Sequence, residues 1–489
     1  MLSRRSALFS AFAACVALPH RSRAQDGAPL GEKPEPVTIL RVQRRNIEVN
    51  GKAASVLGVR QPDGAPGLVT EVGRRFRVRV DNELDAPTLI HWHGLAPPWR
   101  QDGVPGISGP PISPGASAEY DFPLRFGGTF WMHSHEGLQE QSLLSAPLII
   151  RDGRDPPGRQ EATIMLADFS FTPAAQIYAE LRKRNGRPAS LTPSGAAKSG
   201  TSPSKVPRVD GVDKRGEAKG PDLNDVRYDA FLANERTLAD PETIRVEPGE
   251  PILLRVINSS SMSAYHLDLG ALSGELVAVD GFRVRPVPGQ RFPIAVAQRL
   301  DILVKVPRRP AAFPVRAILE GERRQTGVIL VAGRAPVSRV SENALKPSPA
   351  LTLDLERRLR AAAPLASPKP DRTHQVDLTG EMNGYVWSIN GVSWNKDVPP
   401  LAVAEGERVE LVLQNKTRMS HPMHLHGHQF QVVEIDGERF SGAVRDTVLV
   451  TPGSRVVVEF DANNPGWWAF HCHLLYHQAA GMFATVRYI

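Results

Sequence analysis

The hydrophobic residues of this chain fall into short runs. Runs such as 75–80, 252–257 and 455–460 are rich in β-branched residues, alternate in part with polar positions, and are bounded by Pro and Gly. Alternation with a period of two is typical of half-buried strands, whereas an amphipathic helix repeats its apolar positions every three to four residues. The pattern therefore predicts an all-β protein built from sandwiches or barrels, with few helices.

A repeated pattern accompanies these strands. Segments 73–82, 249–258 and 406–415 each begin with Gly, continue as a predicted strand, and end in Asn nine positions later. A second match links only the outer copies, because 128–135 and 466–473 are both a turn followed by a strand that ends in His-x-His. Repetition of this kind predicts three related domains, which agrees with a length of 489 residues.

The repeats set the expected domain limits. We place the first domain at 35–152, the second at 160–333 and the third at 370–489, with a Pro/Ala-rich linker at 334–369. A basic Ser/Gly/Lys-rich stretch at 183–225 has too few large apolar residues to pack, and we interpret it as a disordered, solvated loop of the second domain and not as a binding surface.

The N-terminus has the features of an export signal. Arg4-Arg5 precede an apolar segment, 7–18, and Ser22-Arg23-Ala24 fits a cleavage site. The paired arginines resemble the twin-arginine type of signal, which directs bacterial proteins out of the cytoplasm in folded form. A lipid anchor on Cys15 is the weaker alternative, because the apolar segment continues past that residue. We therefore expect residues 1–24 to be removed and the protein to be periplasmic.

Removing the signal changes the charge and cysteine totals. Residues 1–24 hold four arginines and no acid, so the net charge falls from +7 to +3, which is weak support for a nucleic-acid partner. No remaining run reaches the roughly 18 apolar residues of a membrane span. Cys472 becomes the only cysteine, so an intrachain disulfide is impossible and the thiol needs another explanation.

Most of the histidines are clustered. On a strand, alternate side chains share one face, so each His-x-His presents two imidazoles that can converge on a metal ion. One such pair is weak support for a metal site, but repeat-equivalent pairs in the first and third domains predict a centre shared between them. Of the 14 histidines, ten lie in four clusters, which are His91 with His93, His133 with His135, His421 with His424 and His426, and His471 with His473 and His477.

Cys472 predicts a second centre. Its neighbours His471 and His473 face the shared cluster, so its sulfur points the other way. His421 and His477 can converge on it, which gives the two imidazoles and one thiolate of a blue copper site, with Met482 as the weak axial ligand or, alternatively, as a core methionine. The peptide links on either side of Cys472 offer a short path for electrons between the two centres.

The other domains lack this second centre. In the first domain, non-ligating residues occupy the corresponding positions, and these are Thr88, Ser134, Gln139 and Leu144. The second domain has Tyr265-His266-Leu267-Asp268 in place of His-x-His. We interpret His266 and His374 as structural or surface residues, and His428 as structural or as support for a ligand.

In its histidine clusters and around Cys472, the chain resembles the three-domain multicopper oxidases, which include laccases and bacterial copper-resistance oxidases. The resemblance implies three cupredoxin-like Greek-key β-sandwich domains, a type 1 copper in the third, and a trinuclear copper cluster between the first and third. It spans about residues 70 to 482, and the segments that carry it are 91–94, 131–135, 421–427 and 471–482.

The resemblance also implies a ligand set for four copper ions. By position, the type 1 ligands are His421, Cys472, His477 and Met482. The type 2 copper takes His91 and His424. One type 3 copper takes His93, His133 and His473, and the other takes His135, His426 and His471.

The activity that the resemblance implies is oxidation of a small reductant at the type 1 copper, where Cys472 admits the electrons, coupled to reduction of dioxygen to water. Phenols, aromatic amines and the ions Mn(II), Fe(II) and Cu(I) are all candidate substrates, although only 8 scattered Met residues argue against a specialised Cu(I) oxidase. Two alternatives are a periplasmic copper-binding or copper-tolerance protein with little turnover, and a metal-free scaffold, which the complete ligand set disfavours. We expect a monomer.

Proton delivery is where the sequence departs from the family. Asp102, which follows the first His-x-His, resembles the acid that the family keeps near the cluster, although an ordinary Asp-Gly turn is an equal alternative. Several bacterial relatives carry a second carboxylate directly after the last type 1 histidine. This chain has Gln478 there, which cannot act as an acid.

Overall fold

The computed structural model confirms the all-β class, with three pairs of sheets and few helices. The predicted signal at 1–24 and most of the stretch 183–225 lie outside the described residues. No helix in the described part of the chain has the length and apolarity to cross a membrane. The structure describes residues 36–153, 158–184, 222–366 and 368–489.

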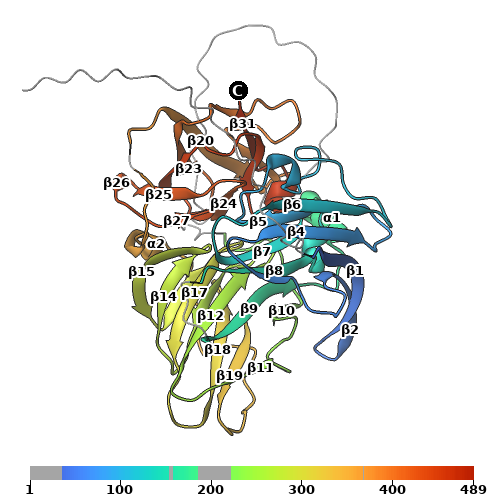
Figure 1. Cartoon of the computed structure of the whole chain (residues 1–489), viewed down its shortest axis with the longest axis vertical. Helices are drawn as coiled ribbons and strands as arrows, with labels where there is room; N and C mark the ends of the chain where they lie inside the picture. The colour runs from blue at the N-terminus through green and yellow to red at the C-terminus, as the bar shows by residue number, and fades with distance from the viewer. Residues whose placement is uncertain (1–35, 154–157, 185–221, 367) are drawn as a thin grey trace, which may run out of the picture. The chain divides into compact units, whose positions relative to one another are not determined.

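The first pair of sheets encloses its own hydrophobic core and appears in blue and teal in Figure 1. The sheet orders are β2-β1-β4-β6 and β3-β8-β7-β5. Two short 3-10 helices, Trp99–Gln101 and Gln139–Ser142, lie in its connections. The strands are β1 (Thr38–Val49), β2 (Lys52–Arg60), β3 (Leu68–Glu71), β4 (Arg75–Asn82), β5 (Ile90–His93), β6 (Ser117–Pro123), β7 (Gly128–Ser134) and β8 (Ser145–Arg151).

The second pair of sheets is green to yellow in Figure 1. Its orders are β10-β9-β12-β17-β14-β15 and β11-β19-β18-β13-β16. One helix, α1 (Ala174–Arg184), follows its first strand. The strands are β9 (Gln160–Phe169), β10 (Ala230–Ala233), β11 (Thr243–Val246), β12 (Pro251–Asn258), β13 (Tyr265–Asp268), β14 (Gly274–Val279), β15 (Phe282–Gly289), β16 (Arg291–Ile294), β17 (Arg299–Lys305), β18 (Ala311–Leu319) and β19 (Gln325–Ala332).

The third pair of sheets is orange to red in Figure 1. Its orders are β21-β20-β23-β29-β25-β26, with β27 also paired to β25, and β22-β31-β30-β24-β28. Helix α2 (Asp354–Arg358) precedes it and α3 (Leu475–Ala479) follows β30. The strands are β20 (Arg372–Glu381), β21 (Val386–Ile389), β22 (Leu401–Val403), β23 (Arg408–Asn415), β24 (His421–Leu425), β25 (Phe430–Ile435), β26 (Glu438–Arg439), β27 (Val444–Arg445), β28 (Thr447–Val450), β29 (Arg455–Asp461), β30 (Trp467–Cys472) and β31 (Phe483–Tyr488).

The repeated Asn has the same role in each domain. Asn82, Asn258 and Asn415 end β4, β12 and β23, and all three are buried. Each side-chain amide donates to two backbone carbonyls, and each side-chain oxygen accepts the N–H two residues further on. Leaving such buried groups unpaired costs roughly 1–3 kcal/mol, which explains why the strand must end in Asn.

The histidine strands are paired in equivalent registers. In the first domain β5 pairs with β7 and places His91 opposite His133. In the third domain β24 pairs with β30 and places His424 opposite His471. Because alternate side chains share a face, each pair of strands presents its His-x-His residues together. The fold thereby brings two such faces into one buried centre.

Candidate metal centre

The first ligand group surrounds the single cysteine of the third domain. Cys472 Sγ lies 3.6 Å from His421 Nδ1 and 4.0 Å from His477 Nδ1, and the two nitrogens are 3.3 Å apart. All three side chains are buried. Burial raises the pKa of the Cys472 thiol well above its usual value, so the thiolate needs a bound cation to stabilise it. Two imidazoles and one thiolate at this spacing suit copper.

The outer nitrogens of these two imidazoles are held by oxygen atoms. His421 Nε2 lies 2.7 Å from Thr417 Oγ1, and His477 Nε2 lies 2.9 Å from Asp225 Oδ2. The Tyr385 hydroxyl also donates to Asp225, at 2.7 Å. With the N–H on the outer nitrogen, each ring presents a free Nδ1 to the sulfur of the cysteine. Asp225 belongs to the stretch interpreted from sequence as an unpacked loop, so sequence reasoning missed this contact.

Met482 is placed beside this group by backbone hydrogen bonds. Its carbonyl accepts the Cys472 N–H at 3.1 Å, and its own N–H donates to the His477 carbonyl at 2.9 Å. The side chain is fully buried in the hydrophobic core of the third domain. Backbone hydrogen bonds therefore hold Met482, the proposed axial ligand, beside Cys472 and His477.

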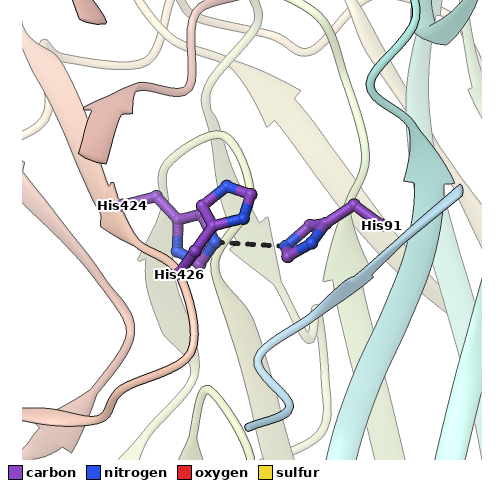
Figure 2. A group of neighbouring side chains, drawn as sticks. All are labelled: His91, His424 and His426. Carbon is purple, nitrogen blue, oxygen red and sulfur yellow. Dashed lines mark hydrogen bonds between the residues drawn. The ribbon is translucent and has the colours of Figure 1, made fainter. Parts of the chain in front are cut away.

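The second ligand group lies between the first and third domains and begins with a matched pair of histidines. His91 Nε2 and His424 Nε2 are 3.5 Å apart, and Figure 2 shows the two rings meeting from strands of different domains, with His426 beside His424. Each Nδ1 lies 2.9 Å from a backbone carbonyl oxygen, of Asp102 for His91 and of Asp446 for His424. The two Nε2 atoms are therefore the ones free to share a metal ion.

A trio of nitrogens converges next to this pair. His471 Nε2 lies 3.3 Å from His135 Nε2 and 3.0 Å from His426 Nε2. Burial first, and neighbouring imidazoles second, lower the pKa of all three rings well below the usual value, which keeps the rings neutral. Neutral imidazoles whose lone pairs converge form a metal site and not a salt bridge.

The last trio shows the need for a cation most directly. His93 Nδ1, His133 Nε2 and His473 Nε2 are buried and have no hydrogen-bond partner. Buried polar atoms without a partner are rare and require an explanation. The other nitrogens of two rings are engaged, because His93 Nε2 lies 3.0 Å from Asp446 Oδ1 and His133 Nδ1 lies 2.9 Å from Glu140 Oε2. The three rings lie with their centroids 5.0 to 5.6 Å apart, and a metal ion between the unpartnered nitrogens would satisfy them.

Asp102 lies at the second group, fully buried. Its Oδ2 is 2.8 Å from His426 Nδ1 and its Oδ1 is 3.2 Å from His91 Nδ1. The following Gly103 has φ +86°, and an added Cβ would lie 1.9 Å from the Ile90 carbonyl oxygen. The Asp-Gly pair is therefore a tight turn and also a contact to two candidate ligands, so the two alternatives from the sequence are compatible.

Two further buried carboxylates were missed by sequence reasoning. Asp446 contacts His93 and His424, as described above. Glu140 contacts His133, and its other oxygen lies 3.9 Å from His473 Nδ1, with neither of these two atoms in a hydrogen bond. Burial raises the pKa of Glu140 well above its usual value. The only sequence signals are that Glu140 closely follows a His-x-His and that Asp446 lies in a polar Arg-Asp-Thr triplet, 445–447, between apolar residues.

Gln478 lies beside the second ligand group and lines a cavity there. Its Nε2 lies 3.3 Å from His135 Nδ1. Both residues line a cavity of about 300 Å³ whose walls include Ile107, Trp467 and Phe483. Position 478, directly after His477, is thus occupied by a neutral amide at an opening beside the histidines.

In the first domain, the residues at the positions equivalent to the cysteine site also lie together, but none of them is a proposed ligand. Thr88 Oγ1 and Ser134 Oγ both donate to Gln139 Oε1 at 2.8 Å. The Ser134 N–H donates to the Leu144 carbonyl at 3.0 Å, as that of Cys472 does to Met482. The positions that the repeat made equivalent therefore lie together, linked by hydrogen bonds.

The remaining histidines in the described residues bond to the protein. His266 Nε2 lies 3.1 Å from the Pro349 carbonyl oxygen and His374 Nε2 lies 2.9 Å from that of Ala402. His428 is buried between the His426 carbonyl and the Tyr488 hydroxyl. These three are structural in the described chain, as the sequence indicated.

Comparison with known proteins gives a consistent result. The curated multicopper oxidase MmcO of Mycobacterium tuberculosis is 32% identical over 459 residues, which cover 92% of this chain and 86% of that protein. The copper resistance protein A homolog of Pseudomonas syringae pv. tomato is 28% identical and covers 92% of this chain and 91% of its own. Three segments match protein families described as multicopper oxidase, and these are residues 41–155, 161–332 and 367–488.

Solved structures share the fold. Fet3p, a multicopper oxidase that functions in iron import, superposes with a TM-score of 0.73 at 20% identity, covering 92% of this chain and 90% of that one. A multi-copper oxidase from Pseudomonas thermotolerans superposes with a TM-score of 0.67 at 24% identity, covering 92% and 98%.

Proposed function

Because the chain belongs to the multicopper oxidase family, we propose that its two buried ligand groups hold the four copper ions that these oxidases use. The protein is a copper-dependent oxidase with dioxygen as electron acceptor. Its fold is that of three cupredoxin-like β-sandwich domains, for which we propose the limits 35–152, 160–333 and 370–489. Bound copper supplies one-electron redox chemistry at the first group and reduction of dioxygen to water at the second.

We propose the ligand assignment that the family resemblance implies, and the contacts of the ring nitrogens support it. His421, Cys472, His477 and Met482 form the type 1 site. His91 and His424 form the type 2 site. The unpartnered nitrogens of His93, His133 and His473 form one type 3 site, and the converging nitrogens of His135, His426 and His471 form the other. The observation that supports the proposal is that buried ring nitrogens at all four sites lie close together and are left free by the protein.

Electron transfer uses the chain itself. The two type 3 histidines on either side of Cys472 are its covalent neighbours, so the path from sulfur to each imidazole runs through a single peptide unit. The His471 Nδ1 also lies 2.9 Å from the Cys472 carbonyl oxygen, which adds a hydrogen-bonded link. Cys472 is therefore the residue through which electrons pass to the second group.

We also propose a class of reducing substrate, a compartment and an assembly state. We propose a small reductant, either a phenol or aromatic amine or a metal ion, and export to the periplasm by the segment 1–24, with the mature protein a monomer. Relatives named for copper resistance favour a physiological role in copper tolerance. A copper-binding protein with little turnover is the alternative function.

The Cys472→Ser variant tests the assignment. We expect it to lose the intense blue thiolate-to-copper absorption and the oxidation of external substrates, and to keep about three copper ions per chain by metal analysis. The matched control is Thr88→Ala, at the equivalent of His421 in the first domain, which should keep the blue band. A blue band that survives in Cys472→Ser would place the type 1 copper elsewhere.

A further inference from the structure

The second domain has no His-x-His, yet it supplies a side chain to the histidine centre. Arg299, the first residue of β17, is fully buried. Its guanidinium donates hydrogen bonds to both carboxylate oxygens of Asp446 in the third domain, with Nη1 2.8 Å from Oδ1 and Nη2 in close contact with Oδ2. A planar guanidinium that donates to both oxygens fixes the position and the rotation of the carboxylate.

Asp446 transmits this constraint to two candidate ligands. Its Oδ1 lies 3.0 Å from His93 Nε2, and its backbone carbonyl oxygen lies 2.9 Å from His424 Nδ1. Since His93 uses Nε2 for Asp446, its Nδ1 is the nitrogen left without a partner. The carboxylate therefore selects which nitrogen His93 presents to a metal ion.

Arg299 also ties the first domain to this arrangement. Its Nε donates to the carbonyl oxygen of Thr129 in β7, at 3.2 Å, on the strand that ends with His133 and Ser134. Its Nη2 donates to the carbonyl oxygen of Asp280 in its own domain, at 3.1 Å. One side chain of the second domain thus bonds to strands or loops of all three domains.

Gly94 supports the same conclusion independently. This residue follows His93 directly and has φ +91°. A Cβ at this position would lie 2.6 Å from Arg299 Nη2 and 2.8 Å from Asp446 Oδ2. The backbone after His93 therefore lies directly against the Arg299–Asp446 ion pair, which leaves room only for glycine.

The charges of the network are matched at short range. Burial by itself would raise the pKa of Asp446, but the Arg299 guanidinium and then His424 lower it below its usual value. Asp280 Oδ2 accepts from Arg445 Nε at 2.9 Å, and Arg445 in turn contacts Glu356. A buried pair of this kind adds little net stability but is costly to break, which is typical of a group kept for position.

We propose that Arg299 is a positioning residue for the trinuclear copper site, through which the second domain, which carries none of the assigned copper ligands, orients His93 and His424 by way of Asp446. The proposal rests on the ligand assignment above. It gives the second domain a part in the metal site that none of its own histidines provides.

The test compares Arg299→Met with Arg255→Met in the copper-loaded protein. Arg255 is a matched control because it is also a buried arginine of the second domain and bonds to Thr129, but its partner acids are Asp301 and Glu161. Chelator titration followed by metal analysis and electron paramagnetic resonance reports type 1 and type 2 copper separately. Changes of residues that orient metal ligands typically weaken binding about 10- to 100-fold.

We expect Arg299→Met to lose type 2 and type 3 copper at about 10- to 100-fold lower chelator concentration while it keeps the type 1 signal, and Arg255→Met to match the wild type. Wild-type retention in Arg299→Met, or equal losses in both variants, would overturn the proposal. If Arg299→Met does not fold, Arg299→Lys tests the proposal instead, since lysine keeps the charge and loses the bidentate hydrogen bonding to Asp446. Selective loss of trinuclear copper in Arg299→Lys supports the proposal and wild-type retention refutes it. A wild-type protein without a blue band would instead refute the ligand assignment itself.

Discussion

Apart from His473, whose two ring nitrogens are both without a hydrogen-bond partner, each imidazole that is assigned as a ligand divides its two nitrogens between the protein and the metal. His91, His424 and His471 direct Nδ1 to backbone carbonyl oxygens, whereas His93 directs Nε2 to a carboxylate. Because the nitrogen that holds the N–H cannot bind copper, these contacts decide which nitrogen each ring offers. The centre is therefore specified by its oxygen acceptors as much as by its histidines.

Met482→Leu should raise the reduction potential of the type 1 copper. The thioether donates electron density to the oxidised ion, and leucine cannot, but the axial bond is weak, so copper content should stay near the wild-type value. Redox titration of the blue band measures the potential. An unchanged potential would mean that Met482 only fills space in the core.

Asp102→Asn should slow reoxidation of the reduced protein by dioxygen by about 10²- to 10⁴-fold, the usual effect of removing a positioned general acid. Asp102 carries this load because position 478 is an amide and because its two oxygens face His91 and His426. Stopped-flow mixing of anaerobically reduced protein with oxygen follows this step.

Two controls accompany the Asp102 variant. Reduction of the type 1 copper by substrate should keep its wild-type rate, and metal analysis should find a full copper content, which excludes a loss of ligands. Reoxidation at the wild-type rate would reduce Asp102 to a turn residue and leave the proton donor to be found elsewhere.

At the level of strands, the sequence already contained the main elements of the site. The Gly-strand-Asn repeat and the His-x-His pairs predicted three β domains and a shared centre, because both features depend on spacing within one strand. Arg299, Glu140 and Asp446 could not be predicted in the same way. Each is a single charged residue whose partner lies on another strand or in another domain, so no local spacing marks it.

Glu320 makes the stability of the fold depend on pH, through a contact between the end of β18 and the segment that links the second and third domains. It follows β18, and its carboxylate accepts the N–H of Leu351 from the segment between the second and third domains, at 2.6 Å. Burial raises its pKa from 4.5 to about 7. The folded state therefore holds a proton that the unfolded chain has released, so this contribution is complete below pH 4.5 and is lost as the pH rises through about 7.

Glu320→Gln should remove this dependence. Between pH 4.5 and 8 we expect the wild type to lose about 3 kcal/mol of unfolding free energy that the variant keeps. Urea unfolding at several pH values measures the difference. Glu275→Gln, which changes an exposed carboxylate of β14, serves as control and should follow the wild type. Parallel curves for Glu320→Gln and wild type would contradict the assignment of the raised pKa.

For the molecule as a whole, the domains are joined in two different ways. One hydrophobic cluster runs through the second and third domains and includes the linker residues Leu351, Leu353 and Leu359, whereas the first domain has mainly its own core. The first and third domains meet through histidines and buried carboxylates, and also through a small hydrophobic cluster of Val104, Ile107, Ala469 and Phe483. With the ligands proposed above, copper bound there would stabilise that junction, because it would bind only the assembled site.

We propose that this protein couples the oxidation of a small reductant to the reduction of dioxygen through four copper ions. The most direct measurement is oxygen uptake during oxidation of a phenolic substrate by protein whose copper content has been determined. We predict about four copper ions per chain, four substrate electrons consumed per dioxygen, and no accumulation of hydrogen peroxide. Copper bound without oxygen uptake would identify a copper-storing protein, and peroxide as the product would contradict the trinuclear assignment.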